Sequence, residues 1–213
     1  LHYPLRRQRQ MCIRDRLIKE RTGANPRQFG QLFKINPTVE DIPDDFSIQY
    51  QGIKLLVMGA VRKGGEGCAC PENVLLKNLL TEIMLRRQEI VVVDMEAGIE
   101  HLGRATAHGI DKMLIVVEPG SRSIDTARII FKMAKEIGLK DFAIVGNKIQ
   151  SSQQADWVKK QFEADMVLGM IPYSSAILEA DLNQFPLYGS LDEQSLGEFR
   201  NICRKLCKSA KVP

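Results

Sequence analysis

The chain has 213 residues, of which 44% are hydrophobic and 26% are charged, a composition typical of a globular protein with a sizeable core. This balance excludes intrinsic disorder, and no apolar run approaches the roughly 20 residues that a membrane-spanning helix needs. The first residues also lack the hydrophobic segment of a secretory signal. We therefore expect a cytoplasmic protein without a membrane partner.

The formal net charge of +4 comes from the first sixteen residues. Residues 1–16 carry five arginines and one aspartate, which leaves 25 basic and 25 acidic residues in the remainder. The basic signal belongs to this tail, so we expect no nucleic-acid partner. The tail resembles translated sequencing-adaptor sequence, especially at MCIRDR. We expect residues 1–16 to be foreign and residues 17–213 to form one incomplete domain; the alternative is a basic disordered arm.

The hydrophobic pattern predicts helices alternating with strands along most of the chain. A helix end at Leu17–Gly23 and a proline-rich loop at Ala24–Asp45 come first, followed by an edge strand, a turn at Gln51 and Gly52, and a buried strand. Further helices and strands then alternate, which predicts an α/β fold with a three-layer, doubly wound, mostly parallel sheet. The predicted strands are Phe46–Gln51, Ile53–Val61, Ile90–Val93, Lys112–Val117, Phe142–Gly146 and Met166–Ile171, and the later helices are Asn73–Gln88, Ile99–His108, Ser123–Ile137, Gln154–Phe162, Ala176–Asp181 and Leu191–Lys208.

The run Ile90–Val93 is β-branched throughout and predicts a central parallel strand that is covered on both faces. Asp94 ends this run and Gly98 follows four residues later. An acid at the carboxyl end of such a strand lies where open α/β sheets bind ligands. In nucleotide triphosphatases the acid of an Asp-x-x-x-Gly pattern holds the Mg²⁺ shell, and the glycine N–H approaches the γ-phosphate. An ordinary strand end is the alternative.

Five cysteines in a chain of this size do not predict a disulfide framework. Cys68 and Cys70 flank one alanine, so in an extended chain both sulfurs face the same side and can bind one metal ion. Two thiolates do not complete a tetrahedral site, and a two-fold dimer would supply the same pair twice. Such a site suits zinc, while the sequence leaves nickel open. We expect Cys203 to continue the apolar stripe of the last helix and to pack as a small hydrophobe, and a metal role for Cys203 and Cys207 stays open.

Two further motifs follow predicted strands, on the same sheet edge as Asp94. Asn147 and Lys148 follow Phe142–Gly146, and Pro172 follows Met166–Ile171. An asparagine amide at this edge can read the donor and acceptor pattern of adenine, and the loop after the next strand can wall the base. Ordinary turn chemistry is the alternative for each motif alone.

Together these stretches resemble a known family. From residue 17 to about residue 190 the chain resembles the CooC-type accessory ATPases that insert nickel into carbon monoxide dehydrogenase, within the group of MinD-like ATPases and the nitrogenase iron protein. The stretches that carry the resemblance are GGEGCACPENVLLKNLL, VVVDMEAGIEHLGRAT, VVEPGSRSI and VGNK. The resemblance implies an α/β fold of the P-loop NTPase type.

The resemblance also assigns residues to roles. It implies that Cys68 and Cys70 are a metal-binding pair at a homodimer interface and that Asp94 and Gly98 belong to the second switch, which organises Mg²⁺ and senses the γ-phosphate of ATP. It implies that Asn147, with Lys148 and Pro172, binds the base. The client would be the catalytic subunit of carbon monoxide dehydrogenase. The resting metal, nickel or zinc, stays open.

One departure from the family is large. The family begins with a strand and a Walker A loop that carries phosphate-binding lysines, and this sequence has neither; RKGGEGCACP at residues 62–71 resembles such a loop but has cysteines where Gly-Lys-Ser/Thr belongs. We therefore expect an N-terminally truncated family member that lacks the P-loop strand and is inactive as an ATPase.

Two other functions compete with nickel delivery to carbon monoxide dehydrogenase. The first is maturation of the nickel cluster of acetyl-CoA synthase by an ATPase of the same family. The second is a positioning ATPase of the MinD or ParA type. The last helix favours the second, because basic residues accompany its apolar stripe: Arg200, Arg204, Lys205, Lys208 and Lys211. A helix docked on the sheet with its charges in water is the simpler interpretation.

Overall fold

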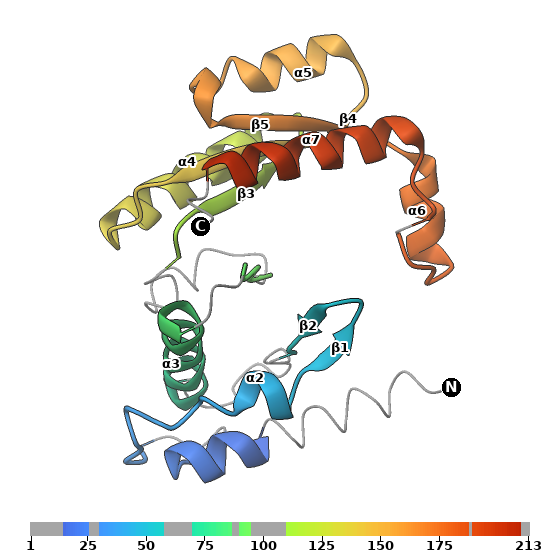
Figure 1. The fold of residues 1–213 in the computed structure, drawn as a ribbon. Helices are drawn as coiled ribbons and strands as arrows, with labels where there is room; N and C mark the ends of the chain where they lie inside the picture. Colours follow the sequence, from blue (N-terminus) through green and yellow to red (C-terminus); the bar gives the residue numbers. More distant parts are fainter. Residues whose placement is uncertain are drawn as a thin grey trace. The chain divides into compact units, whose positions relative to one another are not determined.

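The computed structural model describes residues 15–25, 30–57, 70–86, 90–94, 110–187 and 189–209. The chain forms two compact units, and we describe each by itself. The first comprises residues 1–96 and 104–109, and the second comprises residues 97–103 and 110–213. Figure 1 shows the elements along the chain. In the described part, no helix is both long and apolar enough to cross a membrane.

The second unit is built on a parallel sheet of three strands in the order β3, β4, β5 (Figure 1). The alternation predicted from the sequence is confirmed here, with boundaries that differ by at most three residues. Helices connect the strands because parallel neighbours require a crossover. The elements are β3 (Met113–Val117), α4 (Ser121–Glu136), β4 (Phe142–Ile149), α5 (Ser152–Lys159), the 3₁₀ helix η2 (Ala164–Met166), β5 (Val167–Pro172), α6 (Ser175–Leu182) and α7 (Glu193–Ser209).

Helices cover both faces of this sheet. Phe142 on β4 meets Phe131 of α4, with ring centroids 5.0 Å apart. The next residue, Ala143, belongs to a buried cluster that includes Ile202 of α7. Successive side chains of a strand point to opposite faces, so α4 and α7 lie on opposite sides of β4. This arrangement confirms the predicted doubly wound α/β fold.

Helix α7 docks on β5 through its apolar stripe. Phe199, Ile202 and Leu206 pack onto the sheet, and Lys205 donates a hydrogen bond from Nζ to the carbonyl of Leu168. The expectation that Cys203 continues this stripe is wrong, because Cys203 is exposed. The buried position one turn after Phe199 is taken by Ile202 instead. The apolar face of α7 is therefore occupied by the sheet.

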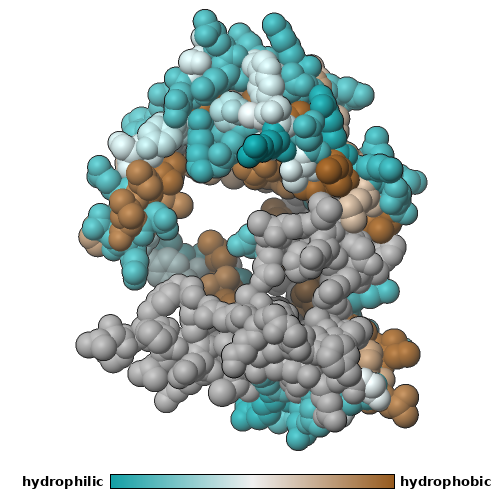
Figure 2. Space-filling model, turned by 180° about the vertical axis from the view of Figure 1, so that it is seen from behind, coloured by the Kyte–Doolittle hydropathy of each residue, from teal (hydrophilic) through white to brown (hydrophobic). Residues whose placement is uncertain are grey.

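Helix α6 buries little of its surface. Ala180 is buried, whereas Leu178 and Leu182 on α6 and Phe185 just beyond it are exposed. Figure 2 shows apolar residues gathered at the outer end of the second unit, where α6 lies. The packing of the second unit therefore depends on α4, α5 and α7 rather than on α6.

The first unit has a small helical core. Residues 15–22 are helical, and α2 (Ile42–Asp45) and α3 (Cys70–Arg86) follow. The helices contribute most of one buried cluster, made of Leu17, Ile18, Val39, Ile42, Leu75 and Leu79. Helix α2 lies in the segment predicted as a proline-rich loop. The helix tolerates Pro43 because this residue falls in its first turn, where the missing N–H costs no hydrogen bond.

The hairpin of the first unit is shorter than predicted. β1 (Ile48–Tyr50) pairs antiparallel with β2 (Ile53–Leu55). Gln51 and Gly52 both have positive φ, 48° and 80°, as a two-residue turn with the twist of a hairpin requires. The predicted turn is confirmed, but the buried strand Ile53–Val61 is wrong where it is described, because every residue of β2 is exposed. Positions 58–61 lie outside the described residues.

The central strand predicted at Ile90–Val93 is also wrong. Residues 90–94 form no strand, and the exposed fractions of Ile90 and Val92 are 72% and 87%. A parallel strand exists only through hydrogen bonds to its neighbours. Within the described ranges, none of the three ladders, β1 with β2, β3 with β4 and β4 with β5, includes this run.

The contact between Gly169 and α7 yields a stability prediction. A Cβ at position 169 would lie 2.6 Å from Cγ1 of Ile202, so we expect Gly169→Ala to lower the free energy of unfolding by about 1–3 kcal/mol. At Gly197 a Cβ meets no atom within 4 Å outside its own helix, so Gly197→Ala should raise stability by about 0.5–1 kcal/mol. Urea unfolding of both variants measures this. Equal stability of wild type and Gly169→Ala would contradict the packing described for α7.

Candidate functional site

Three predicted site residues meet at the carboxyl edge of the parallel sheet. Asn147 and Lys148 lie near the end of β4, and Pro172 is the last residue of β5. Ile149 of β4 is paired with Pro172 of β5. Because the strands are parallel, their ends lie at one edge, the edge where open α/β sheets bind ligands. Asn147 and Pro172 are half-buried and Lys148 is exposed.

Asn147 and Lys148 lie inside β4 and not in the loop after it, so the predicted strand end at Gly146 is wrong. The strand continues through an irregularity: β4 advances from Gly146 to Ile149 while β5 advances only from Met170 to Pro172. One residue is therefore extra in β4, and Lys148 has a positive φ of 57°. An extra residue of this kind is a β-bulge, which bends the strand and redirects side chains.

Glu118 is a charged neighbour of this bulge that sequence reasoning missed. It follows β3 directly, and its Oε1 lies 2.6 Å from Nζ of Lys148. Its backbone N–H also donates to Oγ of Ser123 at 3.0 Å, which ties the strand end to the first turn of α4. Both charged side chains are more than half exposed, 53% for Glu118 and 58% for Lys148. The ends of β3 and β4 are thus joined by a solvent-exposed ion pair.

The chain after Pro172 is held by a second polar cluster. Asp192, at the start of α7, accepts hydrogen bonds from Oγ of Ser174 at 2.8 Å and from the backbone N–H of Ser195 at 2.7 Å. The Ser195 N–H, followed by the Ser174 hydroxyl, lowers the pKa of Asp192 below its ordinary value. An aspartate just before an apolar helical pattern is a helix-start signal, so this cap could have been found from the sequence.

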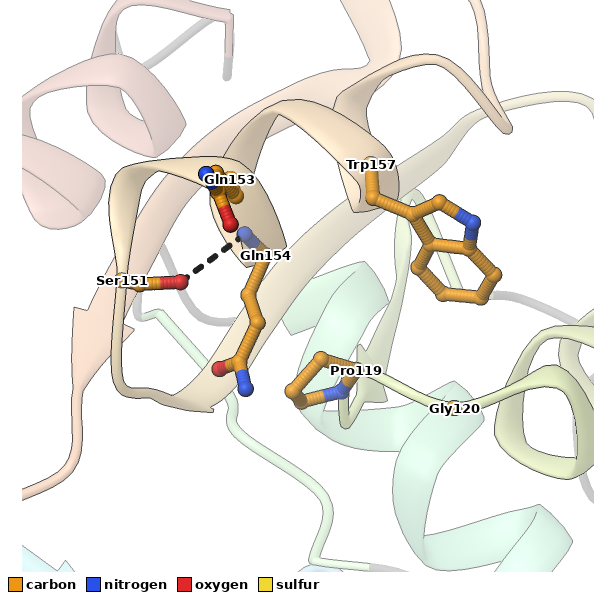
Figure 3. Close-up of a pocket in the computed structure, with 6 residues that line it drawn as sticks. All are labelled: Pro119, Gly120, Ser151, Gln153, Gln154 and Trp157. Atoms are coloured by element: carbon orange, nitrogen blue, oxygen red, sulfur yellow. Dashed lines mark hydrogen bonds between the residues drawn. The ribbon is translucent and has the colours of Figure 1, made fainter.

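A pocket of about 340 Å³ lies next to the turn that follows Glu118 (Figure 3). Pro119 and Gly120 belong to the turn between β3 and α4, and the other lining residues come from α5 and from Ser151 directly before it. The Ser151 hydroxyl caps α5 by accepting from the N–H of Gln154, and the indole of Trp157 stands on the same helix. None of the predicted site residues lines this pocket, whose full lining is Pro119, Gly120, Ser151, Gln153, Gln154 and Trp157.

The remaining predicted residues belong to the first unit or lie outside the described residues. Asp94 ends the irregular run 90–94 with an exposed side chain. Cys70 is the first residue of α3. Cys68 and Gly98 fall outside the described ranges. Among the residues described, no group of three or more histidine, cysteine or acidic side chains could hold a metal ion.

The chain is similar in sequence to several known proteins. The chain is 40% identical over 198 residues to an uncharacterized ATP-binding protein, MJ0823, of Methanocaldococcus jannaschii, a match that covers 92% of this chain and 76% of the relative. It is 45% identical over 165 residues to the carbon monoxide dehydrogenase accessory protein CooC of Rhodospirillum rubrum, covering 78% of this chain and 62% of that protein. A second uncharacterized ATP-binding protein of M. jannaschii, MJ0084, is 32% identical over 163 residues, 76% of this chain and 65% of the relative. No family model matches.

The Asp192 cluster predicts a pH dependence of stability. Because the pKa of Asp192 is lowered in the folded state, its ionised form stabilises the fold above the unfolded value of 3.8, and this contribution is lost as the pH falls through the lowered pKa. We expect the urea midpoint to fall more steeply below about pH 4 in wild type than in Asp192→Asn. Ser174→Ala, which removes one hydrogen bond, should give an intermediate slope. Parallel curves for wild type and Asp192→Asn would disprove the linkage.

Proposed function

Because the chain belongs to the CooC-type family of ATP-binding proteins, we propose that it is an ATP-dependent metallochaperone that assists nickel insertion into carbon monoxide dehydrogenase. The 45% identity to CooC over 165 residues is the observation that carries this proposal. The chain spans less than two thirds of that relative's length. The activity, substrates and partners of the whole protein are therefore part of the proposal.

ATP binds at the carboxyl edge of the sheet. The amide of Asn147 pairs with the donor and acceptor edge of adenine, and the chain at Pro172 walls the base. Half-burial of both residues and their position on paired strands support this assignment. The family resemblance assigns Asp94 to the Mg²⁺ shell, a role that a carboxylate can fill because Mg²⁺ commonly takes one or two carboxylates plus substrate phosphates, and it assigns Gly98 to sensing the γ-phosphate.

The transported metal binds to Cys68 and Cys70. Helix α3 begins at Cys70, and the positive end of a helix dipole favours the thiolate form that binds metal. Two such pairs, one from each protomer of a homodimer, provide four thiolates for nickel or zinc. ATP binding brings the pairs together, and hydrolysis loosens the dimer and changes their geometry.

The metal assignment can be tested with matched cysteine pairs. Cys68→Ser combined with Cys70→Ser should reduce bound zinc or nickel from about one ion per two chains to background. The control is Cys203→Ser with Cys207→Ser, which removes two exposed thiols of α7 and should leave the metal content unchanged. Metal content after dialysis, measured by mass spectrometry, separates the two. Unchanged metal in the first variant would reject the site.

We expect no ATP hydrolysis by the 213-residue chain. Its sequence has no Gly-Lys-Ser/Thr closure of a phosphate loop, so no lysine stabilises the transferring phosphoryl group. Phosphate release from Mg·ATP should equal the rate without protein. Turnover by the wild-type chain that Asp94→Ala abolishes would overturn this expectation.

The client is the least constrained part of the proposal. Reconstitution with nickel-free carbon monoxide dehydrogenase and, in parallel, nickel-free acetyl-CoA synthase distinguishes the two nickel enzymes. Activation of the first alone supports the proposal, whereas activation of the second alone replaces the client. Co-sedimentation with liposomes or DNA would favour a positioning ATPase instead.

A further inference from the structure

The bulge in β4 determines the directions of the side chains at the carboxyl end of this strand. Gly146 is paired with Met170 and Ile149 with Pro172, so Asn147 and Lys148 together occupy the space that one residue fills on β5. Ile149 is buried, which shows that the strand is back in register after the bulge. The direction of Asn147 is therefore set by the backbone conformation at the bulge and not by the regular alternation of the strand.

The conformation of Lys148 is the unusual feature of this bulge. Its φ of 57° lies in the left-handed region, which glycine enters freely and a lysine enters only at a cost in backbone energy. A neighbouring interaction can offset part of that cost. The described structure provides one at 2.6 Å, the ion pair between Nζ of Lys148 and Oε1 of Glu118.

We infer that Glu118 is a positioning residue of the base site, which holds Lys148 in the left-handed conformation and so directs the amide of Asn147 toward the base. The inference rests on the proposed nucleotide site and adds a residue that acts without touching the ligand. This inference changes the role that the family resemblance implies for Lys148: its amino group is engaged by Glu118, and its part in the base site is to set the backbone conformation next to Asn147. Glu118 is itself anchored through its N–H to Ser123 of α4, so the ion pair connects the bulge to a long helix.

The ion pair between Glu118 and Lys148 should affect base selectivity, measured as the ratio of the affinities for ADP and GDP. Adenine and guanine carry different donor and acceptor patterns, and an amide discriminates between them only when its orientation is fixed. An exposed ion pair contributes modestly, so its loss should reduce the preference for ADP over GDP by about two- to five-fold rather than abolish binding. A general loss of folding would not change this ratio selectively.

The test compares ADP and GDP affinities of the full 213-residue chain by isothermal titration calorimetry with Mg²⁺ present. Glu118→Gln should lower the ADP preference by about two- to five-fold. Glu118→Gln combined with Lys148→Gly should return the ratio to the wild-type value, because glycine adopts the left-handed conformation without an ion pair. Asp125→Asn, which breaks the exposed 3.2 Å pair with Arg128 on α4, is the control and should leave the ratio unchanged.

The outcomes separate this inference from the proposed function. A wild-type chain without a preference for ADP over GDP overturns the base site, and the role of Glu118 falls with it. A wild-type preference that survives Glu118→Gln overturns the role of Glu118 alone. A reduced preference that Lys148→Gly fails to restore also overturns it, because the effect would not pass through the backbone of residue 148.

Discussion

Parallel pairing of β3, β4 and β5 constrains everything else in the second unit. Strands that run in one direction require helical crossovers, and their ends collect at a single edge. The crossovers place α4 on one face, and α7 closes the other because Gly169 leaves room for Ile202. Residues that are far apart in sequence, such as Asn147 and Pro172, become neighbours at that edge as a consequence of strand direction alone.

The polar interactions at this edge are weak compared with the core and serve a different purpose. Glu118 with Lys148, and Asp192 with Ser174, are exposed or partly exposed contacts, and such contacts contribute little to global stability. Their effect is local. Each selects one conformation for a strand end or loop whose backbone is otherwise free to adopt several. The core thus determines where the carboxyl edge of the sheet lies, and the polar contacts determine the conformation of the strand ends and loops at that edge.

Most of the second unit could be predicted from its sequence because the hydrophobic period of each helix and strand is a local property. The β4 bulge could not, since it depends on how β4 is aligned with β5. The same limit applies to Glu118, whose partner is set by the pairing of β3 with β4. Cys203 shows a smaller error: a shift of one residue exchanged it with Ile202 in the buried row.

In the first unit, composition was a poorer guide. Ile90–Val93 has the composition of a buried strand, yet composition reports what a segment could bury and not whether a neighbour pairs with it. The predicted site residues also fall into two groups, those that the parallel sheet positions and those outside the second unit or outside the described residues. Asn147, Lys148 and Pro172 share one edge because the sheet brings them together, whereas Asp94 belongs to the other unit and Cys68 and Gly98 lie outside the described residues.

The exposure of Ile90, Val91 and Val92 has a consequence for how copies of this chain behave in solution. A β-branched run without proline, in which the side chains of Ile90, Val91 and Val92 are exposed, has the composition of segments that seed cross-β aggregation. Acidic residues flank the run, Glu89 before it and Asp94 after it. Charges in these positions act as gatekeepers, because stacking copies in register would bring like charges together. A negative charge at Asp94 therefore opposes stacking of this run in register, independently of any part that Asp94 has in a binding site.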